Sequence, residues 1–217
     1  MTTWGTLLTN IRNDLQDTAS TPRWSNATLY MYTCDAIRDY SVWFPKRVDQ
    51  ASLTLSGTSY PLPADFVEDI TVESPVDTFL ERRDERPGRR YLAQGKPICY
   101  FIEGGNLYLN GTPLTGDLVL LTYFATHPVP TSETQTAFVI TIPDRDLELL
   151  RLYVKAQVNI QMRGKQARLD RFDAGSGRRD DNPLMPEAIN LMQDYYNKIA
   201  SRITGGVIKL YRPGRTR

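Results

Sequence analysis

Histidine, cysteine and long apolar runs are scarce in this chain, and each shortage excludes a class of protein. The 217 residues include one histidine, His127, and two cysteines, Cys34 and Cys99. The two cysteines are too far apart for a CxxC or zinc-ligand spacing, so we expect reduced thiols and no metal or other cofactor. Apolar runs such as Leu118–Leu121 fall far short of the ~20 residues of a membrane-spanning helix. We therefore expect a protein made in a cytosol, with no membrane contact.

An excess of charge is also lacking. Lys and Arg number 26 against 25 for Asp and Glu, which gives a formal net charge of +1. Such a chain has no global field that would draw it to nucleic acid or to an anionic membrane. Any claim of that kind must depend on local clusters of charge.

Catalytic signatures are missing from the sequence. There is no GxSxG elbow, no HExxH and no EF-hand spacing. The segment Gly175-Ser176-Gly177 is followed by two arginines, whereas a phosphate-binding loop needs Lys and then Ser or Thr. His127 stands beside Pro128, as expected of a loop histidine. We predict that the chain is not an enzyme; a hydrolase would require Asp or Glu gathered around His127.

Helical patterns occupy both ends of the chain. A cap at Thr2 or Thr3 predicts a first helix to about Leu15, and Ser25 predicts a second to about Trp43. A third should start at Pro143, reach Met162 and end at Gly164; it is apolar nearly all round, so we expect it at the centre. A fourth should run from Pro186 to Thr204-Gly205, with one apolar stripe: Ile189, Met192, Tyr196, Ile199 and Ile203.

Strand patterns fill the middle. A hairpin is predicted around Ser56-Gly57-Thr58, followed by a strand at Val67–Glu73. Three further strands should form a meander: Ile98–Glu103, Leu107–Asn110 and Asp117–Ala125. Its first turn, Gly104-Gly105-Asn106, supplies the positive φ angles of a tight hairpin.

These patterns predict an α+β fold. Residues 1–50 and 137–204 should form a helical bundle, and residues 51–136 an inserted antiparallel β module. Residues 205–217 should form an extended C-terminal arm.

Two segments are candidate contact surfaces. The first is the charged loop Glu81–Arg90, which alternatively is only a solvated loop. Its candidate residues are Arg82, Arg83, Glu85, Arg86, Arg89 and Arg90. The second is the tail, which alternatively is a frayed terminus. Its four apolar residues favour a partner-binding arm, and burial of each contributes about 1.5–3 kcal/mol. The arm consists of Val207, Ile208, Lys209, Leu210, Tyr211, Arg212, Arg215 and Arg217.

The order of these segments resembles a known family. The relevant motifs are Pro22-Arg23-Trp24-Ser25, Tyr60–Phe66, Tyr100–Leu109 and Leu118–Ala125. With two helices on each side and a basic tail, they resemble the head-to-tail adaptors of tailed phages. Within these adaptors, they resemble the group that includes tail tubular protein A of short-tailed phages.

The resemblance implies a role and partners. It implies a homo-oligomeric ring, usually twelve-fold, in the virion neck beneath the portal, assembled in the host cytoplasm. The segment 207–217 would grip the portal, and loops of the β module, including Glu81–Arg90, would contact tail nozzle or tail-tube proteins or neighbouring subunits. DNA would pass through during genome ejection without sequence readout.

One alternative function remains open at this point. A nucleic-acid-binding helical module would use a cluster of basic residues, namely Arg163, Lys165, Arg168, Arg171, Arg178 and Arg179. Its affinity for duplex DNA would fall steeply with salt.

Overall fold

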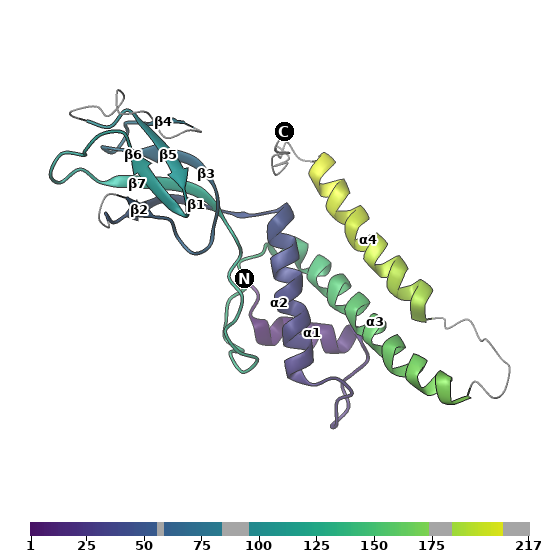
Figure 1. Ribbon diagram of the computed structural model, residues 1–217. Helices are drawn as coiled ribbons and strands as arrows, with labels where there is room; N and C mark the ends of the chain where they lie inside the picture. The colour runs from purple at the N-terminus through teal and green to yellow at the C-terminus, as the bar shows by residue number, and fades with distance from the viewer. Residues whose placement is uncertain (56–58, 84–95, 174–183, 206–217) are drawn as a thin grey trace. The chain divides into compact units, whose positions relative to one another are not determined.

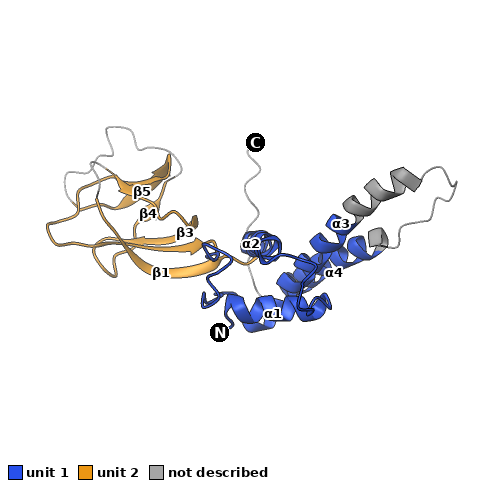
Figure 2. Ribbon diagram, turned by 90° about the horizontal axis from the view of Figure 1, so that it is seen from below, with its two compact units in different colours: residues 1–43, 128–217 blue, residues 44–127 orange. Residues whose placement is uncertain are grey.

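The computed structural model describes residues 1–55, 59–83, 96–173 and 184–205, and for 163–173, 184–186 and 204–205 it describes the helical backbone alone. The chain divides into two units (Figure 2). Unit 1 is Met1–Trp43 with the chain from Pro128 onward, and unit 2 is Phe44–His127. The predicted insertion was 51–136. The observed limits differ from the predicted ones at both ends. Unit 2 begins at Phe44, before its first strand, and the segment after His127 groups with the helical unit.

Among its described residues, unit 1 contains four α-helices (Figure 1), as the helical patterns predict. The first two are α1 (Trp4–Asp14) and α2 (Asn26–Trp43). The hydroxyl of Thr3 accepts a hydrogen bond from Thr6 N at 3.3 Å, and Ser25 Oγ accepts one from Thr28 N at 3.1 Å. Each cap therefore satisfies a backbone donor that has no partner within its helix.

The other two helices of unit 1 are α3 (Leu147–Asp173), which follows the 3-10 turn η2 (Asp144–Asp146), and α4 (Leu184–Gly205). Helix α3 packs against α1, α2 and α4, which confirms its predicted central position. Its predicted end at Gly164 is wrong, because the helix continues through this residue. One glycine costs a helix only about 1 kcal/mol, and the residues that follow it are good helix formers.

The buried face of α4 also differs from the prediction. Ala188, Tyr195 and Ile199 are buried, whereas Ile189 and Tyr196 of the predicted stripe are exposed. Tyr195 fixes this orientation, since its hydroxyl donates to Asp39 Oδ2 at 2.5 Å and its ring lies edge-on to Tyr153. The apolar surface of α4 is consequently wider than the face that the bundle covers.

Unit 2 contains two small sheets. One has the order β1-β7-β3, formed by Lys46–Leu53, Val119–Ala125 and Phe66–Glu73. The other has the order β2-β6-β5-β4, formed by Tyr60–Pro61, Asn106–Leu109, Cys99–Glu103 and Glu81–Arg82. Buried side chains of both sheets, among them Val72, Tyr100, Leu107 and Leu121, share one core.

The strands exist as predicted, but their pairing differs. Strand β1 pairs with β7 and β2 with β6, so no hairpin joins the strands on either side of residues 56–58, which lie outside the described residues. The predicted meander is also divided, because β5 and β6 pair while β7 lies in the other sheet. The pairing of β4 with β5 is parallel, within a module that we expected to be antiparallel. The Gly104-Gly105 hairpin is confirmed, with φ angles of +57° and +77°.

Candidate interaction surfaces

His127 joins the two ends of unit 2. Its Nε2 lies 3.0 Å from the carbonyl oxygen of Phe44, the first residue of the unit. Burial lowers the pKa of the imidazole from its ordinary value, although the hydrogen bond to Phe44 opposes this. A neutral imidazole that donates to a carbonyl oxygen suits a structural clip. The predicted loop histidine is thus hydrogen-bonded and buried.

Arg82 and Arg83 are the two predicted contact residues that the structure describes. Arg82 forms an ion pair with Asp69 at 2.6 Å, and the hydroxyl of Tyr100 donates to the same carboxylate. Arg83 forms an ion pair with Glu81, also at 2.6 Å. The Arg82 and Arg83 side chains remain 48% and 57% exposed. Both guanidinium groups are therefore held in place by neighbours while part of each faces solvent.

Most of the other predicted site residues lie outside the described residues. These are Glu85, Arg86, Arg89, Arg90 and the whole arm Val207–Arg217. Of the alternative nucleic-acid site, Arg178 and Arg179 are also outside. Arg163, Lys165, Arg168 and Arg171 belong to the part of α3 for which only the backbone is described. No described contact favours that alternative.

Exposed apolar side chains were missed by the sequence analysis. Phe79 and Ile98 are 65% and 67% exposed. Phe79 lies two residues before β4 and Ile98 immediately before β5, and these two strands pair with one another. On unit 1, Ile160, Ile189 and Tyr196 are also exposed. A period-2 pattern shows which residues alternate but not which of them a second sheet covers, so the sequence carried no signal for the exposure of Phe79 and Ile98.

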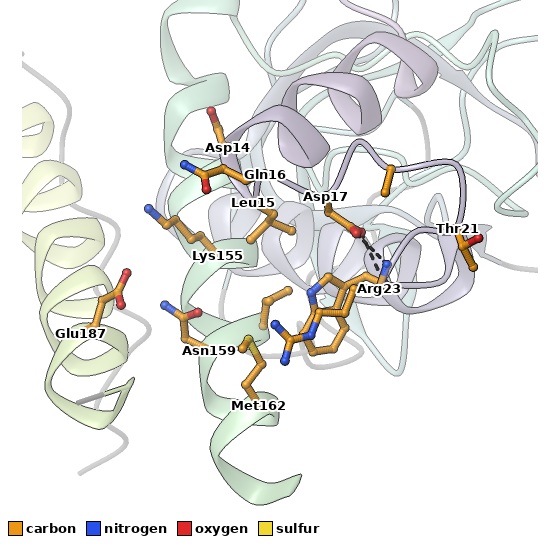
Figure 3. A pocket seen from close by; sticks show the side chains of 13 residues that line it. Asp14, Leu15, Gln16, Asp17, Thr21, Arg23, Lys155, Asn159, Met162 and Glu187 are labelled. Carbon is orange, nitrogen blue, oxygen red and sulfur yellow. Dashed lines mark hydrogen bonds between the residues drawn. The ribbon is translucent and has the colours of Figure 1, made fainter. Parts of the chain in front are cut away.

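A cavity of about 600 Å³ lies in unit 1 between the loop after α1, helix α3 and the start of α4 (Figure 3). Its loop is organised by Asp17, whose carboxylate accepts from Arg12 Nη1 at 2.8 Å and from the backbone N–H groups of Arg23 and Trp24 at 2.6 and 3.1 Å. From α3, Lys155 and Asn159 line the cavity. These two polar residues are spaced i and i+4 on α3, so they lie on one side of the helix.

Neither cysteine nor histidine forms a reactive centre in the described part of the chain. Cys34 and Cys99 are free and buried, and burial raises the pKa of both thiols. Within the described ranges, no three side chains of His, Cys, Asp or Glu gather as a metal site requires. The cavity is lined by Asp14, Asp17 and Glu187, but His127 is not among its residues.

None of the helices in the described part of the chain combines the length and the hydropathy needed to cross a membrane.

Half-exposed ion pairs, apolar side chains at the surface and a polar cavity are compatible with contacts to other proteins. A sequence profile of the family described as SU10 adaptor protein matches residues 2–187. Because the match spans most of the sequence, the chain belongs to this family of phage adaptors. It is a structural component of the virion and has no catalytic role. A comparison with curated proteins finds no match.

Proposed function

We propose that this adaptor assembles into a ring that joins the portal to the tail and lets DNA pass through its channel. Membership of the phage adaptor family is the observation that carries the proposal. We further propose a twelve-fold ring in the virion neck, with tail nozzle or tail-tube proteins on its other side. In this role the chain would be a counterpart of the tail tubular protein A group.

Exposed apolar side chains on each unit support contacts between chains. Phe79 and Ile98 on unit 2, and Ile189 and Tyr196 on unit 1, leave large apolar areas in water. Burying such area contributes about 25 cal/mol per Å². A ring repeats each contact in every subunit, so modest individual contacts give a stable assembly through avidity.

The charge balance supports passage of DNA. With 26 basic and 25 acidic residues, the chain has no excess of positive charge to hold phosphates. Strong phosphate contacts would slow DNA that must slide through a channel. The proposed ring therefore acts as a conduit and reads no sequence.

The C-terminal segment is the proposed portal-binding arm. It follows directly after α4 and carries four apolar residues and three arginines: Val207, Ile208, Leu210, Tyr211, Arg212, Arg215 and Arg217. The family match ends at residue 187, so this proposal depends on the composition of the segment and on the resemblance. Around the β module, Arg82 and Arg83, with Glu85, Arg86, Arg89 and Arg90, are the proposed contacts to tail proteins or neighbouring subunits.

Deletion of residues 207–217 tests the arm. We expect the truncated protein to fold, to lose portal binding and to yield no infectious particles. Two full-length variants separate the contributions: one carries Ser at the four apolar positions, and the other carries Gln in place of the three arginines. We expect the first to lose most of the binding, because apolar burial supplies most of the free energy. Undiminished portal binding and infectivity of the truncated protein would overturn the assignment.

A further inference from the structure

The cavity in unit 1 contains a buried hydrogen-bond donor that has no acceptor. Asn159 is 7% exposed, and its Nδ2 has no hydrogen-bond partner among the residues that the structure describes. A buried amide without a hydrogen bond lowers the stability of the folded chain, so an unpaired one calls for an explanation. Because Asn159 lines the cavity, an acceptor that enters the cavity would supply the missing bond.

The carboxylates of the cavity wall are largely occupied. Arg151 binds the two oxygens of Asp14 through Nε and Nη2, at 2.5 and 2.7 Å. Asp17 is bound by Arg12 and by two backbone N–H groups. The third carboxylate, Glu187, is exposed on α4, where solvent screens its charge. The donor Asn159 therefore does not find its acceptor in the wall itself.

Two cations of the cavity, Lys155 and Arg23, have no carboxylate partner among the described residues. Lys155 is half-buried, whereas Arg23 is exposed, so solvent screens the charge of Arg23 as it does that of Glu187. Lys155 lies one helical turn before Asn159, and Figure 3 shows both side chains on the same side of α3. Arg23 reaches the cavity from the loop, where only its backbone N–H is engaged by Asp17. An amide donor and two cations together favour a negatively charged acceptor.

Apolar side chains complete the lining and restrict the ligand further. Val158 and Met162 lie beside Asn159 on α3, and Leu15 and Trp24 face them from the loop. Such a lining suits a carboxylate on a short aliphatic stem.

We propose that this cavity binds the side-chain carboxylate of a glutamate or aspartate presented by another protein chain. The carboxylate accepts from Asn159 Nδ2 and pairs with Lys155 and Arg23, while its methylene stem packs on Val158 and Met162. The proposal deepens the proposed function, since it adds a protein contact on the helical unit that involves neither the arm nor the β module. The unpaired donor of the free subunit becomes paired on assembly.

The test follows the side-chain amide signal of Asn159 by NMR in the full-length chain. The probes are N-acetyl-glutamate N′-methylamide, the corresponding glutamine compound and inorganic phosphate. We expect saturable shifts with the glutamate compound and none with the uncharged glutamine compound. The variant Lys155→Gln should weaken binding about tenfold, which is the loss of one charge-assisted contact. Lys198→Gln, on α4 and outside the cavity, should leave it unchanged.

The variant Asn159→Leu separates a ligand-binding role from a structural one. Leu has the same branching and number of heavy atoms but no unpaired donor, so we expect a higher melting temperature together with loss of glutamate binding. A lower melting temperature with binding intact would show that Asn159 serves only the fold. Absence of any saturable shift, or equal binding of phosphate, would also overturn the proposal. Ring formation and incorporation into particles, measured separately on the unaltered chain, would still test the proposed function.

Discussion

Asp146 connects three elements of unit 1 through one buried carboxylate. Its Oδ2 accepts from the hydroxyl of Tyr40 on α2 at 2.6 Å, and its Oδ1 pairs with Arg202 on α4. Arg202 also donates to the carbonyl oxygen of Arg145 at 3.0 Å. The end of α4 that precedes the proposed arm is thus fixed to the start of α3.

Replacing this carboxylate should cost more than replacing its exposed neighbour. We expect Asp146→Asn to lower the free energy of unfolding by about 2–3 kcal/mol, because Arg202 loses its counterion in a mostly buried place. Arg202 keeps 29% exposure, which limits the loss. Asp144→Asn is the control, since that side chain is 64% exposed. It should change stability by less than about 0.5 kcal/mol in the same urea titration. Equal losses would contradict a special role for Asp146.

His127 should make the stability of unit 2 depend on pH. Its pKa is lowered in the folded state from an ordinary value of 6.5, so the unfolded chain takes up the proton first as pH falls. The contribution of His127 to the free energy of unfolding is then fully present above pH 6.5 and is lost as pH falls through the folded pKa. The limiting slope of the free energy of unfolding is about 1.4 kcal/mol per pH unit. His127→Gln should flatten this dependence below pH 6.5. An unchanged slope in that variant, measured by chemical unfolding, would assign the effect to other groups.

At the scale of single residues, the sequence predicts the position of a residue within a helix or loop better than it predicts which residue it contacts. It places Asp146 at a helix start and His127 in a loop, and both positions are correct. It does not reveal that Tyr40 and Arg202 converge on Asp146, or that Phe44 meets His127. Those pairings depend on the packing of segments that are distant in sequence.

At the scale of elements, replacing glycine by alanine should have opposite effects on stability at two positions, one in a hairpin and one in a helix. Gly105 has φ +77° in the β5–β6 hairpin, with open space where a Cβ would stand. Gly105→Ala should therefore cost about 1–2 kcal/mol through backbone strain alone. Gly164 lies inside α3, so Gly164→Ala should instead stabilise the chain by about 0.5–1 kcal/mol.

Equilibrium unfolding of both alanine variants beside the parent chain measures these effects. Gly164→Pro provides a further check on the extended helix, because proline in a helix interior costs about 3 kcal/mol. If Gly164→Ala were destabilising and Gly164→Pro neutral, the helix would end at Gly164 as its sequence alone suggests.

Strand partners were the least predictable part of the fold. The patterns located β3, β5, β6 and β7, since alternation and turn residues are local signals. They did not show that β7 leaves β5 and β6 to lie between β1 and β3. Burial of both sheets on one core selects that arrangement, and this choice depends on side chains throughout the unit. The exposure of Tyr196 and burial of Tyr195 likewise follow from packing of α4 on α3.

At the scale of the whole molecule, the chain combines a helical unit, an inserted β unit and a C-terminal segment. We propose that each offers a different kind of contact: a polar cavity in unit 1, exposed apolar and charged side chains in unit 2, and the apolar and basic residues of the C-terminal segment. The family match, the α+β fold and the exposed side chains are consistent with a protein whose work is done through contacts with other proteins.

The most direct measurement is a cryo-electron microscopy reconstruction of the neck of the assembled particle. We expect copies of this chain in a closed ring between portal and tail, with residues 207–217 against the portal and Glu81–Arg90 against another chain. Location of the chain elsewhere in the particle would contradict the proposed role. A ring in which Glu81–Arg90 and the arm face only solvent would contradict the division of contacts proposed for it.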